Sequence, residues 1–124
     1  MLADSDAMAT IAVKDLETAR KFYEEKIGLK RVGDQKGVLT FKSGNTKITV
    51  YVSQYAGTNK ATVATWVVAD AEAEVKAMKS KGLSFEHYDN LPGLTRKGDL
   101  HVAGSFKGAW LKDPDGNILH ILSV

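Results

Sequence analysis

Three histidines, His87, His101 and His120, are the side chains best suited to metal binding or acid–base chemistry in this sequence. His87 and His101 lack the short-spacing partner of a metal-binding pair, and His120 alone is a weak metal site. The chain has no cysteine, which excludes disulfides and thiolate chemistry. It also lacks a Gly-x-Ser-x-Gly nucleophile turn and a glycine-rich phosphate loop. No pattern therefore indicates catalysis, although a triad built from distant positions stays open.

The composition narrows the class of protein. A length of 124 residues predicts one domain, or two fused half-sized units, and 44% hydrophobic residues argue against disorder. The 17 basic and 15 acidic residues leave a net charge of +2, and no basic run exceeds two residues, so we expect no nucleic-acid partner. No apolar run approaches the roughly 20 residues of a membrane span. The absence of cysteine and of a signal-like start predicts a cytoplasmic protein that does not contact a membrane.

The sequence repeats itself after a shift of 55 positions. Residues 8–26 align with residues 63–81, with identities that include Thr10/Thr65, Asp15/Asp70 and Lys21/Lys76. This repeat predicts a single domain over residues 1–124, built by duplication. The first module covers about 7–53 and the second about 61–124, joined by a linker over about 54–60.

Each module is predicted to form a strand, a helix and three further strands. The β-branched segment Ala9–Val13 favours a strand, and Asp15 and Asp70 are suited to cap the two helices. Leu16, Ala19, Tyr23 and Ile27 predict the apolar stripe of the first helix, while Gly28 and Gly82 end the helices. The further strands are expected at 29–34, 37–42, 46–53, 83–88, 105–112 and 117–123. Residues 113–117 are predicted to form a turn and residues 89–104 a long loop, either a surface excursion or a functional segment.

Two motifs resemble those of the vicinal oxygen chelate superfamily. The first is Ile11-Ala12-Val13-Lys14-Asp15-Leu16, followed by Ala19-Arg20-Lys21-Phe22-Tyr23 and Ile27-Gly28-Leu29, and the second is Trp110-Leu111-Lys112-Asp113-Pro114-Asp115-Gly116-Asn117. The family includes glyoxalase I, extradiol dioxygenases and bleomycin-binding resistance proteins. The resemblance implies an α+β fold in which two tandem βαβββ modules form a curled mixed sheet around a cleft. It also implies a homodimer.

The resemblance further implies four metal-ligand positions, which fall at Met8, Thr49, Val63 and His120. Val63 has no donor atom, and the thioether of Met8 is a soft ligand suited to cuprous copper. Thr49 is a weak neutral donor, and His120 stands where the family usually has Glu. One good ligand remains where a catalytic zinc takes three. We therefore expect no metal cofactor.

Strand alternation, combined with the family positions, indicates which side chains line the cleft. We expect an aromatic and aliphatic surface with a few hydroxyl groups and one imidazole, which suits a small organic ligand. The candidate ligand-binding residues are Thr10, Thr49, Tyr51, Thr65, Trp110 and His120. Trp110 is expected to lie beside His120, although either residue could equally belong to the core.

Three functions are compatible with these features. The first is metal-independent binding of a small organic molecule, as in the drug-sequestering branch of the family. The second is a metal-dependent lyase, isomerase or dioxygenase of the glyoxalase type, in which the metal ion would act as a Lewis acid. The third is an interaction domain without a small ligand.

Overall fold

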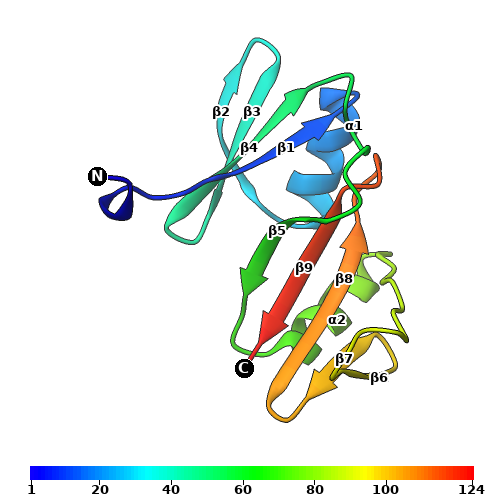
Figure 1. Ribbon diagram of the computed structural model, residues 1–124. Helices are drawn as coiled ribbons and strands as arrows, with labels where there is room; N and C mark the ends of the chain where they lie inside the picture. The colour runs from blue at the N-terminus through cyan, green and yellow to red at the C-terminus, as the bar shows by residue number, and fades with distance from the viewer. The chain divides into compact units, whose positions relative to one another are not determined.

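Two β-sheets, each backed by one helix, organise the chain (Figure 1). The computed structural model describes all 124 residues and divides into two units, which are described separately. The first unit comprises Met1–Val63 and the turn Asp113–Asn117, and the second comprises Ala64–Lys112 and Ile118–Val124. None of the helices has the length and apolar character that crossing a membrane requires.

The first sheet has the strand order β1-β4-β3-β2. β1 runs parallel to β4, and the other neighbours are antiparallel. The strands are β1 (Ala9–Val13), β2 (Lys30–Gln35), β3 (Val38–Ser43) and β4 (Thr46–Val52). The strands predicted for the first module are thus confirmed, with ends that differ by about one residue.

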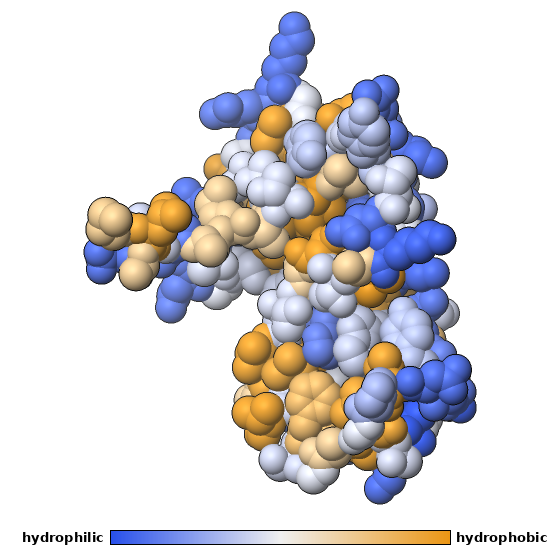
Figure 2. All heavy atoms as spheres, in the orientation of Figure 1, coloured by the Kyte–Doolittle hydropathy of each residue, from blue (hydrophilic) through white to orange (hydrophobic).

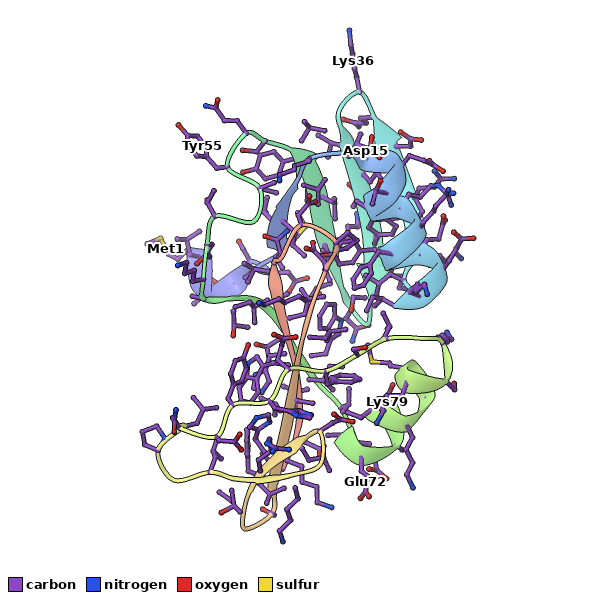
Figure 3. The ribbon with its side chains drawn as sticks, turned by 90° about the vertical axis from the view of Figure 1, so that its right-hand side faces the viewer. Met1, Asp15, Lys36, Tyr55, Glu72 and Lys79 are labelled. Atoms are coloured by element: carbon purple, nitrogen blue, oxygen red, sulfur yellow. The ribbon has the colours of Figure 1, made fainter.

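The helix of the first unit begins after Asp15, as predicted. The Asp15 carboxylate accepts a hydrogen bond of 2.8 Å from the backbone N–H of Thr18, which satisfies an amide at the start of the helix (Figure 3). The α-helix α1 (Leu16–Arg20) continues as a π-helical turn over Lys21–Lys26. The prediction of one regular α-helix was therefore incomplete. The wider turn allows two consecutive aromatic residues, Phe22 and Tyr23, to be buried together.

Alternate residues of the first sheet face this helix and form the core of the unit. The buried side chains come from three strands and are Ile11, Val13, Leu39, Phe41, Ile48 and Val50. The turn Asp113–Asn117 joins this core through a buried hydrogen bond of 2.7 Å from the Tyr23 hydroxyl to Asp113 Oδ2. Asp113 Oδ1 also accepts the backbone N–H groups of Asp115 and Asn117, each at 2.9 Å. The second motif of the sequence thus has a structural role in closing this turn.

The second sheet has the order β5-β9-β8-β7-β6. Its strands are β5 (Thr62–Val67), β6 (Thr95–Lys97), β7 (Leu100–Ala103), β8 (Phe106–Lys112) and β9 (Ile118–Ser123). Helix α2 (Ala71–Ser80) begins at the predicted cap Asp70, whose side chain accepts from the backbone N–H of Ala73. It packs on β8 and β9 through the buried side chains of Ala71, Val75 and Met78.

The structure corrects two predictions in the second module. Residues 83–88 do not form a strand and contribute only an isolated bridge between Glu86 and Trp110. The segment 89–104, predicted to be a loop, instead contains the β6–β7 hairpin, so β7 takes the place expected for 83–88. The hairpin closes at Gly98-Asp99, where Gly98 has a φ of +64°. A two-residue Gly-Asp turn between two short strands is typical of a β-hairpin.

Candidate functional site

The second sheet has one face that α2 leaves open, and the candidate site lies there. Ala109, Leu111, Leu119 and Ile121 are buried against the helix side. Because side chains alternate along a strand, positions 108 and 110 of β8 face the open side, and the side chain of Trp110 projects there. The register pairs Trp110 with His120 and Gly108 with His101. Trp110, His120 and His101 therefore meet on one surface, and Figure 2 shows hydrophobic side chains gathered over this part of the chain.

Trp110 and His120 form the centre of a cluster of five rings, which we call the aromatic cluster. Their rings are stacked, with centroids 4.1 Å apart and parallel planes. His101 and Tyr88 contact the indole edge-to-face, at centroid distances of 4.9 and 5.6 Å. Phe106 lies 6.4 Å from the ring of His120. Tyr88, Phe106 and Trp110 are half-buried, whereas the two histidines are buried.

His101 is held by two hydrogen bonds that define its role. Its Nε2 lies 2.9 Å from the backbone N of Tyr88 and accepts that N–H, while Nδ1 lies 3.3 Å from the Gly108 carbonyl oxygen. An acceptor at Nε2 and a donor at Nδ1 are the two roles of a neutral imidazole. His101 therefore positions Tyr88 against Trp110 and is a structural member of the aromatic cluster.

His120 differs from His101 because its Nε2 atom has no hydrogen-bond partner. This atom is buried, and no other buried side-chain nitrogen or oxygen in the structure lacks a hydrogen-bond partner. Burial lowers the pKa of His120, and His101 lowers it further. The ring is thus neutral near pH 7 and has an unused polar atom beside three partly exposed aromatic rings. An unpaired buried nitrogen is costly, so its presence calls for an explanation.

Gly108 provides the space in which the His120 ring lies. A Cβ atom at position 108 would be 2.9 Å from His120 Nε2 and about 3.0 Å from the ring of Phe106. Both distances are shorter than ordinary carbon contacts, so only glycine allows these two rings to approach the strand.

The charged side chains at the edge of the aromatic cluster are paired with one another. Arg96, opposite His101 in the ladder, makes a 2.6 Å ion pair with Asp89. Lys112, two residues from Trp110, lies 3.5 Å from Glu86. The aromatic surface therefore carries little unpaired charge, and it suits an uncharged ligand better than an ionic one.

The remaining predicted residues lie elsewhere. Thr10, Thr49 and Tyr51 project from the open face of the first sheet, where Thr10 pairs with Thr49 in the ladder. Thr65 is an exposed residue of β5. The structure thus brings together Trp110 and His120 in the second unit, and Thr10, Thr49 and Tyr51 in the first.

The four positions implied as metal ligands fall in both units, Met8, Thr49 and Val63 in the first and His120 in the second. Met8 precedes β1 and is 48% exposed, Thr49 and Val63 are half-buried, and His120 is stacked on Trp110. Taken one by one, these side chains offer one imidazole, one hydroxyl and one thioether, which are weak or mismatched donors for a hard divalent ion. No group of three or more His, Asp or Glu side chains is placed to hold a metal ion.

Three members of the aromatic cluster were not among the predicted site residues. Tyr88 was assigned to a strand, and His101 and Phe106 were not assigned to the site at all. Only the register of β7 against β8 places His101 next to Gly108 and Trp110. The sequence does contain one signal for the position of His101. The Gly98-Asp99 pair is typical of a hairpin turn, and such a turn predicts that His101 lies in the following strand.

Known proteins resemble this chain both in a family model and in their folds. A family model described as the Glyoxalase/Bleomycin resistance protein/Dioxygenase superfamily matches residues 7–121. A search of curated proteins by sequence gives no match. Among solved structures, a glyoxalase/bleomycin resistance protein/dioxygenase from Alicyclobacillus acidocaldarius has a TM-score of 0.72 at 18% identity, over 97% of this chain and 91% of that chain.

Two further structures carry functional descriptions of their own. A lactoylglutathione lyase from Agrobacterium tumefaciens has a TM-score of 0.68 at 19% identity, over 97% of this chain and 93% of that one. An antibiotic binding protein from Streptomyces sp. CB03234 has a TM-score of 0.66 at 18% identity, over 97% of both chains. At these identities the likeness establishes the fold, and function has to be argued from the site.

Proposed function

Because the chain belongs to the glyoxalase/bleomycin resistance protein/dioxygenase superfamily, we propose that it binds a small organic molecule without the help of a metal ion. The observation that carries this proposal is the Trp110–His120 stack with its unpaired Nε2 atom. An aromatic surface with one orienting polar atom is the usual composition of a small-molecule site.

The properties of the aromatic cluster define the ligand that it would accept. Tyr88, Phe106 and Trp110 offer partly exposed ring faces and edges, which favour a flat molecule. The pairing of Arg96 with Asp89 and of Lys112 with Glu86 leaves no free charge to attract an ion. A planar, uncharged ligand with one polar group would stack on these rings and direct that group toward His120.

A metal-dependent reaction would need donors that this chain does not supply at the family positions. His120 would be the one strong ligand there, and Met8, Thr49 and Val63 would add little. A known relative of similar fold is a lactoylglutathione lyase, but at 19% identity this likeness supports the fold alone. Binding without chemistry therefore fits the residues better.

The two tryptophans allow a direct test of this proposal. In the Trp66→Phe variant the remaining fluorescence comes from Trp110, and in the Trp110→Phe variant it comes from Trp66. A panel of uncharged planar aromatic compounds should quench Trp66→Phe saturably and should leave the emission of Trp110→Phe unchanged. A thermal-shift assay on the unmodified chain should give a matching increase in melting temperature, because the ligand binds only the folded state.

The same samples test the competing function. Zn²⁺, Ni²⁺, Fe²⁺ and Mn²⁺ should give no stabilisation that EDTA reverses. Stoichiometric metal binding, or quenching that survives in Trp110→Phe, would overturn the proposal.

A further inference from the structure

Three lysines that form no run in the sequence lie side by side on the first sheet. The ladder pairs Lys30 of β2 with Lys42 of β3, and Lys42 with Lys47 of β4. Direct partners in antiparallel strands project from the same face of a sheet. The neighbours Phe41 and Ile48 are buried against the helix, so the lysines project from the open face. With strands about 4.8 Å apart, the row spans about 10 Å.

No negative charge balances this row. All three lysines are exposed, and none of them makes an ion pair or a side-chain hydrogen bond. Asp34, the one acidic residue of these three strands, pairs with Leu39 in the ladder and so faces the helix side, where it contacts Arg31 at 3.5 Å. Like charges placed directly opposite one another destabilise a ladder. The three lysines should therefore repel one another, and no ion pair with an acidic side chain offsets this repulsion.

A row of hydroxyl groups runs parallel to the lysines. Thr49 pairs with Thr10 on one side and with Thr40 on the other, so three threonines cross β1, β4 and β3 on the same open face. Two residues along a strand separate this row from the lysines, a distance of about 6.6 Å. Hydroxyl groups both donate and accept hydrogen bonds, and the flexible lysine side chains can converge on one group from either side.

We propose that this surface, the lysine row Lys30-Lys42-Lys47 with the threonine row Thr10-Thr49-Thr40, binds a compact organic anion that carries phosphate or carboxylate groups. The ammonium groups neutralise the anionic oxygens, and the threonine hydroxyls hydrogen-bond the adjoining part of the molecule. This site does not depend on the uncharged ligand proposed for the aromatic cluster, because the two surfaces share no residue.

The extent of the charge favours a small anion over a macromolecule. A nucleic acid or an anionic membrane is bound by many basic side chains spread over a long stripe. Here three lysines lie within about 10 Å, and the net charge of the whole chain is +2. A phosphate ester or a dicarboxylate matches this short row in length and in charge.

Nuclear magnetic resonance titration with inorganic pyrophosphate and, separately, with citrate tests the site at low ionic strength. We expect saturable shifts of backbone amides in β2, β3 and β4, centred on Lys42 and Thr40. The Lys42→Gln variant should bind about threefold to fivefold more weakly, as expected for loss of one exposed charge. The matched control is Lys36→Gln, at the tip of the β2–β3 hairpin, whose side chain points away from the unit (Figure 3) and which should titrate like the unmodified chain.

Thermal melting separates this role from a purely structural one. Without an anion, Lys42→Gln should melt at a higher temperature than the unmodified chain, because it relieves repulsion from Lys30 and Lys47. With pyrophosphate or citrate the melting temperature of the unmodified chain should rise more than that of the variant. The difference between the two melting temperatures should therefore become smaller or change sign. Equal gains in Lys42→Gln and Lys36→Gln, or shifts centred outside these strands, would overturn the proposal. So would shifts produced by duplex DNA or phosphatidylserine vesicles and by neither small anion.

Discussion

The indole of Trp110 lies flat on the imidazole of His120, at a centroid distance of 4.1 Å, and the buried Nε2 atom of this imidazole has no hydrogen-bond partner. The two residues are direct partners across β8 and β9. Cross-strand pairing thus fixes the stack, and the burial that it produces keeps the imidazole neutral.

The stack predicts how His120 titrates. Burial lowers its pKa below the ordinary value of 6.5, and His101 adds to this effect. Trp110→Ala should expose the ring and move the pKa of His120 back toward 6.5, as followed by the imidazole proton resonances. An unchanged pKa of His120 in Trp110→Ala would contradict the assigned cause.

A second prediction concerns the space beside His120. Gly108→Ala places a methyl group 2.9 Å from His120 Nε2 and near the ring of Phe106, and it should destabilise the protein by about 1–3 kcal/mol in urea unfolding. Gly33→Ala, whose Cβ would lie 3.3 Å from Thr40, is the milder control. Combining Gly108→Ala with His120→Ala should cost less than the sum of the single changes, because the second change removes the contact of the new methyl group with His120, although the contact with Phe106 stays. Strict additivity would show that the two positions do not compete for space.

A third prediction concerns the turn that belongs to the first unit. The Tyr23 hydroxyl donates to the Asp113 carboxylate at 2.7 Å in a buried position, and burial together with Asp113 raises the pKa of Tyr23, so it remains a donor. Tyr23→Phe should therefore lower the free energy of unfolding by about 1–3 kcal/mol. Tyr55→Phe, at a tyrosine that is 68% exposed, should change it by less than about 0.5 kcal/mol. Equal effects of the two variants would contradict a specific role for the Tyr23–Asp113 bond.

Local patterns in the sequence predicted most of the fold. The strand Ala9–Val13 and the caps Asp15 and Asp70 follow from β-branched residues and from side chains that accept backbone amides, and the structure agrees with each. The strand expected at 83–88 was wrong because an apolar segment beside a sheet can lie against it without joining the ladder. The Glu86–Trp110 bridge is all that it contributes.

The candidate site was harder to predict because it depends on register. Alternation along β8 and β9 predicted that Trp110 and His120 would be neighbours, and the structure stacks them, while their part in ligand binding stays a prediction. His101 reaches the aromatic cluster only through the pairing of β7 with β8. The lysine row also depends on strand register and could not be predicted from the sequence. Lys30, Lys42 and Lys47 form no basic run in the sequence, and only the ladder brings them together.

The last prediction follows from the lowered pKa of His120 and concerns the stability of the protein as pH falls. In the unfolded chain this imidazole takes up a proton near its ordinary pKa of 6.5, whereas in the folded protein it does so only at lower pH. The unfolded state therefore binds more protons between these two values, so the folded state loses stability as the pH drops below about 7. Above that range the group has no effect, because it is neutral in both states.

His120→Gln removes this contribution while keeping a polar side chain of similar length. Urea unfolding at pH 8 and pH 5 should show that the free energy of unfolding falls less in His120→Gln than in the unmodified protein. His87→Gln is the matched control: because it retains His120, its free energy of unfolding should still decrease between pH 8 and pH 5. If the difference between His120→Gln and the unmodified protein were the same at both pH values, the imidazole of His120 would not be held neutral by burial. The proposed preference of this site for an uncharged ligand would then lose its electrostatic basis.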